Sequence, residues 1–511
     1  MSGRVSVFDA LLQARLRSGA ATPILEDHER KPLTYGDLVR AAFALGGKLK
    51  AMTAPRERVG VLLPSSAGAA VTFFALHAIG RTPAMLNFTA GAMNLKAALA
   101  AANVKTVLTS ERFLEQGNLQ ALAEELSAHA MIVRLEQLRE KIGVHDKMGA
   151  VVSGLAPGVF RSAAKPDDEA VVLFTSGSFG APRGVVLTHA NLVSNVRQIA
   201  AHIAFDPEWV FFNPLPVFHS FGLTGGLLLP LLTGHKAFVY PSPLHFKIIP
   251  RLIRESGANV LLATDTFAYQ YARAAEDGDL SGLRFAVCGA ERVRRETRDI
   301  YARRFNVMLL EGYGATEASP VIAVNQPTDN HEGTVGAVLP GMEVRLEKVP
   351  GIEEGANLLV RGPNVMKGYL SEDGLHPPQD GWHDTGDVVS IDARGSITIL
   401  GRVKRFAKIG GEMVSLAAVE AYASALWPES RHAAVAVPCS RKGEKVILVS
   451  DEPEAQPHAL LDWAQTHGAP EIAIPKTIMT VREVPVLGSG KTDYVAVRAM
   501  ADIHADGARA A

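Results

Sequence analysis

The chain has little cysteine, almost no net charge and no long apolar run. Only two cysteines, Cys288 and Cys439, occur in 511 residues, and they stand far apart. Neither a disulfide framework nor a zinc-ligand spacing is therefore indicated. The 52 basic and 53 acidic side chains leave a net charge of -1. This charge gives no general attraction to nucleic acid, so an anionic ligand must be held locally.

The longest apolar runs, at 71–79 and 223–232, are too short to cross a bilayer. The first residues lack the basic and apolar regions of a signal peptide. Together with the scarcity of cysteine, these absences lead us to expect a cytoplasmic protein with at most peripheral membrane contact.

The remaining pattern predicts an α/β protein of more than one domain. Up to about residue 332, short apolar runs alternate with helical patterns, which is typical of doubly wound, mainly parallel sheets. The polar stretch 116–165 is expected to be an irregular excursion. Short strands between glycines and prolines at about 333–400 predict a small β subdomain. We place the large N-terminal domain at 1–401 and a small α+β domain at 402–511.

A loop rich in hydroxyls and glycine is predicted between two apolar strands. It reads Thr175-Ser176-Gly177-Ser178-Phe179-Gly180-Ala181-Pro182-Arg183-Gly184. Glycine lets backbone amides approach a ligand, and hydroxyls add donors, so the loop suits the oxygens of a polyphosphate. The alternative is an ordinary Gly/Ser hairpin turn.

Two further strands are expected to end in polar segments at the carboxyl edge of a sheet, where open α/β folds bind ligands. These segments are Gly289-Ala290-Glu291 and Gly312-Tyr313-Gly314-Ala315-Thr316-Glu317. Between them and the first loop lies His219, flanked by aromatic residues ahead of an apolar run. It is interpreted either as a buried structural histidine or as a gate at the mouth of an acyl pocket.

With two more motifs, Trp382-His383-Asp384-Thr385-Gly386-Asp387 and Pro485-Val486-Leu487-Gly488-Ser489-Gly490-Lys491, and with Gly401-Arg402 between them, the chain resembles the acyl-adenylate-forming (AMP-binding) synthetases. The resemblance covers nearly the whole chain. It implies that a fatty acid reacts with ATP to give acyl-AMP and pyrophosphate, and that a thiol then takes the acyl group.

The resemblance also implies roles for these residues. Lys491 would bridge the fatty-acid carboxylate and the α-phosphate, as a mobile point charge between two anions can. Thr316 would donate to the α-phosphate or the carboxylate, and Glu317 would hold Mg²⁺. The nucleotide would lie against Gly289, Ala290, Glu291, Gly312, Tyr313, Gly314, Asp387 and Arg402, with its phosphates in the loop of Thr175, Ser176, Gly177, Ser178, Gly180, Arg183 and Gly184. Taken alone, Asp387 could be a turn residue and Lys491 a solvated loop lysine.

For the second step the resemblance implies a mobile C-terminal domain. Lys404 matches the hinge, and Lys408, Gly410 and Gly411 match a loop that swings in beside a phosphopantetheine arm. Within the superfamily the chain looks most similar to the acyl-acyl-carrier-protein synthetase half of 2-acylglycerophosphoethanolamine acyltransferase, but without the acyltransferase part. An acyl carrier protein is therefore the expected acceptor.

Coenzyme A as acceptor, an enzyme that stops at the adenylate, and a non-catalytic adenylate or acyl binder remain alternatives. The last is raised by two departures from the family pattern, Phe179 for threonine and Arg183 for lysine. Arg183 keeps the positive charge and can grip phosphate with two donors. Asp265 leaves open an amino acid as substrate, because a carboxylate there could hold an α-amine.

Overall fold

The computed structural model describes residues 5–176, 182–371, 373–409, 412–439, 443–467, 469–486 and 492–510. The chain forms two compact units. Unit 1 comprises the residues up to 332 together with 338–342 and 361–383, and unit 2 comprises 333–337, 343–360 and the residues from 384 onward.

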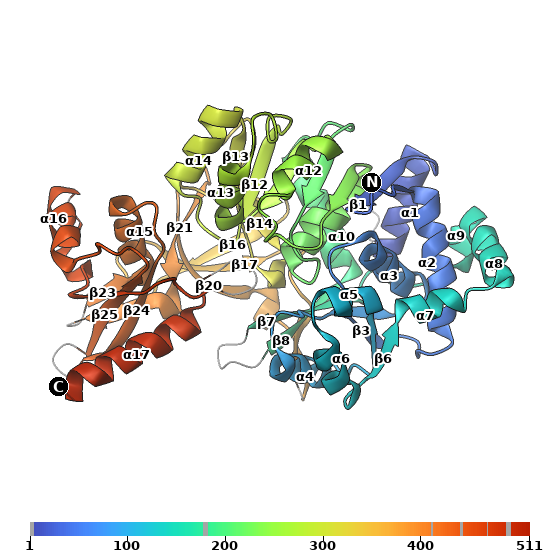
Figure 1. Cartoon of the computed structure of the whole chain (residues 1–511), viewed down its shortest axis with the longest axis horizontal. Helices are drawn as coiled ribbons and strands as arrows, with labels where there is room; N and C mark the ends of the chain where they lie inside the picture. The colour runs from blue at the N-terminus through green and yellow to red at the C-terminus, as the bar shows by residue number, and fades with distance from the viewer. Residues whose placement is uncertain are drawn as a thin grey trace. The chain divides into compact units, whose positions relative to one another are not determined.

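Unit 1 contains a first sheet whose central strands are parallel (Figure 1). Its order from one edge is β14-β13-β12-β11-β9-β10-β1-β2, and β15 adds to the β14 edge. The β13–β14 and β1–β2 pairs alone are antiparallel among the pairings described within that order. The strands are β1 (Pro23–Asp27), β2 (Leu33–Thr34), β9 (Val210–Asn213), β10 (Lys236–Val239), β11 (Val260–Ala263), β12 (Phe285–Gly289), β13 (Met308–Gly314), β14 (Val321–Val324) and β15 (Ala337–Val338).

A second sheet in unit 1 has the order β19-β18-β8-β7-β4-β3-β5-β6. Its strands are β3 (Arg58–Val61), β4 (Thr82–Met85), β5 (Thr106–Thr109), β6 (Met131–Arg134), β7 (Glu169–Ser176), β8 (Pro182–Thr188), β18 (Gly368–Ser371) and β19 (Gly374–His376). The strands β7 and β8 pair antiparallel, with Thr175 opposite Arg183. The predicted loop at 175–184 therefore begins within β7 and ends within β8, and residues 177–181 lie outside the described residues.

Helices cover both sheets. They are α1 (Val7–Ser18), α2 (Tyr35–Lys50), α3 (Ala67–Ala78), α4 (Ala92–Ala101), α5 (Glu111–Gln116), α6 (Gln120–Ser127), α7 (Leu135–Glu140), α8 (Val144–Leu155), α9 (Pro157–Phe160), α10 (His189–His202), η1 (Phe221–Leu228), α11 (Leu229–Thr233), α12 (Ile249–Ser256), α13 (Asp265–Ala274), α14 (Arg295–Ile300), η2 (Tyr301–Phe305), η3 (Thr316–Ala318) and η4 (Gln379–Gly381). The Thr34 hydroxyl oxygen accepts from the backbone amide of Asp37, and the Asp37 carboxylate accepts from the backbone amide of Thr34. This reciprocal capping explains why the helix begins there.

The expectation of an irregular excursion at 116–165 is wrong. The segment contains the helices α6, α7, α8 and α9, and its strand β6 pairs with β5 at the edge of the second sheet. Short helices with exposed apolar side chains gave a weak pattern in the sequence, because their inner faces bury small residues such as Ala150 and Gly154.

Unit 2 holds a four-stranded sheet and a second, larger sheet with helices. The first has the order β16-β17-β20-β21, with β16 (Glu343–Glu347), β17 (Ala356–Arg361), β20 (His383–Ile391) and β21 (Ile397–Arg402). The second contains β22 (Phe406–Ile409), β23 (Glu412–Ser415), β24 (His432–Cys439), β25 (Gly443–Ser450) and β26 (Thr477–Thr480), with η5 (Val403–Arg405), α15 (Leu416–Leu426), α16 (Pro457–His467), η6 (Glu471–Ala473) and α17 (Tyr494–Ala510). The predicted α/β class and the small β subdomain are present. The predicted boundary at Gly401 falls inside β21 and stays a prediction.

A partly buried polar cluster connects η5, α15 and α17 in unit 2. The Arg405 guanidinium donates to the Glu420 carboxylate at 2.7 Å and lies 3.7 Å from the Tyr494 ring centre. The Tyr494 hydroxyl donates to the same carboxylate at 3.2 Å. Burial, with the Glu420 charge adding to it, raises the pKa of Tyr494 to about 12, so its proton stays in place at neutral pH. The cluster fixes η5 to the first turn of α17.

Within the part of the chain that the structure describes, no helix is both long and apolar enough to cross a bilayer.

Glycine is required at one turn of η1, and this requirement is testable. A methyl group on Gly226 would lie 2.1 Å from the side chain of Asn213, which donates to the Gly222 carbonyl at 3.0 Å and accepts from the Leu215 amide at 3.1 Å. We expect Gly226→Ala to lower the free energy of unfolding by about 1–3 kcal/mol. The matched change Gly47→Ala meets nothing within 4 Å on α2 and should raise it by about 0.5–1 kcal/mol. Urea unfolding of both variants checks the difference, and equal effects would contradict the packing argument.

Candidate functional site

Two neighbouring strands of the first sheet end together. Gly289 at the end of β12 lies opposite Gly312 on β13. A methyl group on Gly289 would lie 3.1 Å from the Phe221 ring, and one on Gly314 would lie 2.2 Å from the Pro320 carbonyl oxygen. The close packing of these strand ends therefore depends on glycine. The sequence expectation that both segments reach one sheet edge is realised in the geometry.

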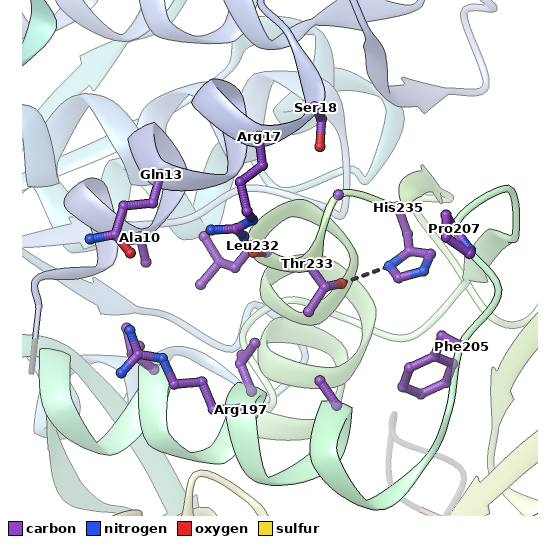
Figure 2. A pocket seen from close by; sticks show the side chains of 14 residues that line it. Ala10, Gln13, Arg17, Ser18, Arg197, Phe205, Pro207, Leu232, Thr233 and His235 are labelled. Atoms are coloured by element: carbon purple, nitrogen blue, oxygen red, sulfur yellow. Dashed lines mark hydrogen bonds between the residues drawn. The ribbon is translucent and has the colours of Figure 1, made fainter. Parts of the chain in front are cut away.

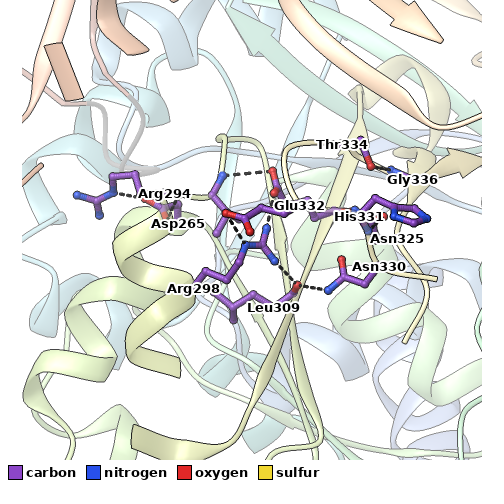
Figure 3. A network of polar contacts seen from close by, with 12 residues as sticks. Asp265, Arg294, Arg298, Leu309, Asn325, Asn330, His331, Glu332, Thr334 and Gly336 are labelled. Atoms are coloured by element: carbon purple, nitrogen blue, oxygen red, sulfur yellow. Dashed lines mark hydrogen bonds and ion pairs between the residues drawn. The ribbon is translucent and has the colours of Figure 1, made fainter. Parts of the chain in front are cut away.

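Behind these strand ends lies a set of buried ion pairs (Figure 3). Asp265, 3% exposed, accepts from the Arg294 side chain at 2.5 Å and from the Arg294 amide at 3.1 Å. The Arg298 guanidinium pairs with Glu311 at 2.5 Å. Next to Asp265, the Glu291 carboxylate accepts from the Thr266 amide at 3.0 Å. The Asp265 carboxylate is thus engaged by Arg294 rather than presented to a substrate amine.

The buried Cys288 at this edge is not a nucleophile candidate. Burial raises the pKa of its thiol well above the usual range, and the negative charges of Asp265 and Glu311 act in the same direction. Because the thiolate is the reactive form, chemistry at this edge falls to oxygen and nitrogen groups.

Thr316 and Glu317 lie in η3, directly after β13. The Thr316 hydroxyl is 3.3 Å from the hydroxyl of Ser220, which precedes η1. The Glu317 carbonyl accepts from the Met366 amide at 2.7 Å, which holds this turn of backbone in place. Ser220 was not singled out in the sequence, although it stands next to His219. Two hydroxyls side by side can both donate to an anion.

Tyr369 connects Glu317 to the second sheet. Its hydroxyl donates to the Glu317 carboxylate at 2.7 Å, and the Arg183 guanidinium lies 5.6 Å from its ring centre. The residue is on β18, which pairs with β8 so that Tyr369 faces Val185. A single tyrosine thereby links the strand that leaves the phosphate-loop candidate to the carboxylate predicted to hold the metal. No local sequence pattern marks Tyr369.

The two ends of the phosphate-loop candidate are described, and its middle is not. Thr175 lies opposite Arg183, and Ser176 lies opposite Pro182. A methyl group on Gly184 would meet Leu370 of β18 at 3.2 Å, so glycine lets the neighbouring strand approach. Gly177, Ser178, Phe179 and Gly180 lie outside the described residues.

The other site residues predicted in unit 1 lie near these strand ends or along the neighbouring chain, and the structure does not fix their roles. Tyr313 is half-buried on β13, and Ala290 has a positive φ of 71° just after β12. His219 is half-buried, with its ring centre 4.7 Å from that of Phe218. It directly precedes Ser220, whose hydroxyl lies beside that of Thr316. Both interpretations of His219 stay predictions.

Unit 2 carries the remaining predicted residues. The Asp387 carboxylate, 7% exposed, accepts from the Arg402 side chain at 3.0 Å, and the arginine is 68% exposed. The pairing arises because the two residues face each other across β20 and β21. Lys404 on η5 and Lys408 on β22 are exposed. Gly410, Gly411 and Lys491 lie outside the described residues.

The Glu317 carboxylate is the group predicted to hold a magnesium ion. No group of three or more His, Cys, Asp or Glu side chains gathers to hold a metal anywhere in the described ranges. Mg²⁺ is often bound by one or two carboxylates together with substrate phosphates and water. Glu317, oriented by Tyr369, fits that kind of shared site.

Unit 1 contains two cavities, one away from these strand ends and one beside them. One of about 440 Å³ lies between α1, α10 and α11 and is lined by Arg17, Arg197 and His235 among others (Figure 2). Its lining segments come just before β9 and β10, so it is at the amino ends of parallel strands, opposite to the edge of Gly289. The second, about 30 Å³, is apolar and lies beside Phe221, Gly225 and Val287.

Comparison with known proteins agrees with this architecture. Residues 12–370 match the model of the AMP-binding enzyme family. A feruloyl-CoA synthase of an Amycolatopsis species is 29% identical over 480 residues, which are 91% of this chain and 93% of that protein. A medium-chain fatty-acid–CoA ligase of Escherichia coli (strain K12) is 28% identical, over 71% of this chain and 68% of that protein.

Among solved structures, ATP-bound MatB from Rhodopseudomonas palustris superimposes with a TM-score of 0.82 at 22% identity, covering 97% of this chain and 99% of that one. The likeness extends over both units and supports the α/β fold. The chain belongs to the AMP-binding enzyme family.

Proposed function

We propose that this protein is an ATP-dependent acid–thiol ligase that converts an apolar carboxylic acid into an acyl-adenylate and then into a thioester. The observation that carries the proposal is the junction at Glu317. Glu317 follows the end of β13, next to the paired hydroxyls of Thr316 and Ser220. Tyr369 donates to the Glu317 carboxylate and lies beside Arg183 of the strand that leaves the phosphate-loop candidate. Family membership supports ATP as the nucleotide.

In the first step a carboxylate oxygen of the acid bonds to the α-phosphorus of ATP, and the bond to pyrophosphate breaks. Both reactants are anions, so positive charge and hydrogen-bond donors must lie where they meet. Thr316 and Ser220 supply hydroxyl donors, and Arg183 supplies charge on the loop side. A magnesium ion held by Glu317 and the phosphates would neutralise charge on the leaving pyrophosphate. Lys491 is proposed to bridge the two anions.

In the second step the sulfur of a thiol bonds to the acyl carbonyl carbon, the thiol proton is released, and AMP leaves with the anhydride oxygen. We propose that Asp387 binds the ribose hydroxyls, with Arg402 holding its carboxylate at 3.0 Å. Lys404 and Lys408, with Gly410 and Gly411, are proposed to act as hinge and thiol-side loop. This assignment rests on the family resemblance of their positions.

The acid is proposed to be apolar, with a fatty acid as the leading candidate. Asp265 does not offer a site for an α-amine, because Arg294 occupies its carboxylate. The space behind Phe221 is lined by apolar residues of η1, β11, β12 and β14. At about 30 Å³ it is too small for an acyl chain, so the half-buried Phe221 ring would have to move for a chain to enter.

Free coenzyme A is the better supported acceptor. The relatives reported above include a synthase and a ligase named for coenzyme A, whereas the acyl carrier protein expected from the sequence has no such support. Carrier-protein transfer stays the second candidate, on the strength of the sequence stretches that resemble an acyl-acyl-carrier-protein synthetase. A non-catalytic binder would not need the Glu317 and Asp387 contacts that the chain maintains.

The proposal is tested with a panel of fatty, aryl and amino acids, each supplied with ATP, Mg²⁺ and either coenzyme A or phosphopantetheinylated carrier protein. We expect pyrophosphate release that depends on an apolar acid, and a thioester with coenzyme A. Lys491→Ala should slow pyrophosphate release by roughly 100-fold or more, because it removes charge needed in the transition state. The exposed control Lys476→Ala should keep the full rate. Full activity of Lys491→Ala would refute the catalytic assignment, and thioester formation only on carrier protein would reverse the choice of acceptor.

The role of Tyr369 gives a separate prediction. Tyr369→Phe removes the hydroxyl donor to Glu317 and leaves the ring beside Arg183. Since a hydrogen bond to a charged group contributes about 1.5–3 kcal/mol, we expect the Mg²⁺ concentration for half-maximal pyrophosphate release to rise about tenfold. Tyr35→Phe removes a buried hydroxyl that donates to the Leu231 carbonyl at 2.6 Å, and it serves as the control. If both variants show the wild-type Mg²⁺ dependence, Tyr369 does not orient the metal ligand.

A further inference from the structure

An exposed apolar face occupies two consecutive helices of unit 1. Val144, Met148, Val151, Val152 and Leu155 recur along α8 at spacings of three, four and one residues, which places them on one side of the helix. Their exposed fractions run from 49% to 79%. The face continues into α9 with Val159, 79% exposed, and Phe160, 51% exposed. These seven residues are called the α8–α9 face below.

The other side of α8 already packs against unit 1, so the exposed apolar residues are not part of an unfilled core. Figure 1 shows α8 and α9 at the periphery of unit 1, beside α2. Lys48 of α2 bonds to Asp146 at 2.7 Å, and the Arg15 side chain donates to the Gly154 carbonyl at 3.0 Å. A methyl group on Gly154 would lie 2.9 Å from the Arg40 side chain, so α8 packs closely on α2 through its small residues. The opposite side of α8 carries the apolar stripe.

Cations border the start of the face, although the whole chain is nearly neutral. Further along, Arg161 is paired with Asp9, and Glu140 stands beside Lys141 in the sequence. The Asp146 carboxylate is engaged by Lys48. Lys141, Lys147 and His145 are exposed at the start of α8. An approaching anionic surface would therefore meet apolar side chains bordered by cations.

We propose that the α8–α9 face is a docking surface for a membrane that contains anionic lipids. Helices that lie in a lipid interface combine an apolar face with lysine and arginine at its border, and their affinity rises with anionic lipid. Protein interfaces differ, since lysine is depleted in them and about one hydrogen bond forms per 100–200 Å². The α8–α9 face consists of apolar side chains with lysine beside them, which favours lipid over a protein partner or a second copy. Contiguous exposed apolar patches of this kind mark interaction sites.

The docking surface is independent of the proposed ligase activity, because it is remote in the fold from the strand ends that carry Glu317. If the substrate is an apolar acid, as proposed above, a membrane-bound enzyme would be close to it, because such acids partition into bilayers.

The test is sedimentation of the full chain with vesicles of phosphatidylcholine alone and with phosphatidylglycerol added. We expect binding to the mixed vesicles that weakens as salt is raised. The triple variant Val152→Ser/Leu155→Ser/Phe160→Ser should bind mixed vesicles at least about tenfold more weakly, because burial of these side chains provides the affinity. The control variant Met93→Ser/Val495→Ser/Ile503→Ser removes three apolar residues elsewhere that are at least 75% exposed, and it should bind like the wild type.

A second variant separates charge from apolar burial. Lys141→Gln/Lys147→Gln should weaken binding to mixed vesicles and leave the small residual binding to phosphatidylcholine unchanged. The thermal unfolding midpoint and acid-dependent pyrophosphate release of every variant are measured alongside, and both should equal those of the wild type. Absence of wild-type binding, or equal binding by the two triple variants, would overturn the proposal. So would a dimer in light scattering that the first triple variant abolishes while vesicles remain unbound.

Discussion

The hydrogen bond from Tyr369 to Glu317 is the contact on which the candidate site depends. It joins two sheets that are separate in hydrogen bonding, because Glu317 follows the last parallel strand of one and Tyr369 lies near the edge of the other. The second sheet also carries both ends of the phosphate-loop candidate. The Tyr369 hydroxyl thus ties the Glu317 carboxylate to the sheet that carries both described ends of this loop, in addition to the backbone bond from Met366 to Glu317. Ordered placement of charge is what a reaction between two anions requires.

Unit 2 contains a set of partly buried charged and polar groups that pair with one another. Arg405, Glu420 and Tyr494 satisfy one another inside the domain, and Glu420 also accepts from the Ala434 amide at 2.7 Å. Removing one member of such a set leaves a buried charge without its partner. The cluster fastens η5, which contains Lys404, to the helix that begins three residues after Lys491. The cluster therefore holds η5 and the first turn of α17 together within unit 2.

Much of the fold could be predicted because local sequence patterns indicate its helices and strands. Apolar runs alternating with helical patterns indicated the α/β class. The loop at 175–184 was expected between two strands. The strand ends that contain Gly289 and Gly312 were expected at one edge of a sheet, and they lie opposite each other. The alternation and the two strands around the loop depend on residues close together in the chain, and the parallel pairing of consecutive strands brings Gly289 and Gly312 to one edge.

What the sequence did not reveal depends on contacts between distant residues or on an unusual surface. Tyr369 is 52 residues from its partner Glu317, and Ser220 is 96 residues from Thr316. The engagement of Asp265 by Arg294 likewise needed the fold to bring α13 and the start of α14 together. The segment 116–165 was misread because its helices turn apolar side chains outward, where a water-exposed helix usually presents polar ones.

The central claim is that the acid and ATP react before any thiol takes part. Exchange of labelled pyrophosphate into ATP, measured with an apolar acid and Mg²⁺ but without coenzyme A or carrier protein, tests this claim most directly. The account predicts that label enters ATP at a rate that depends on the acid. Thioester formation by a protein that shows no such exchange, or exchange that requires the thiol, would contradict it.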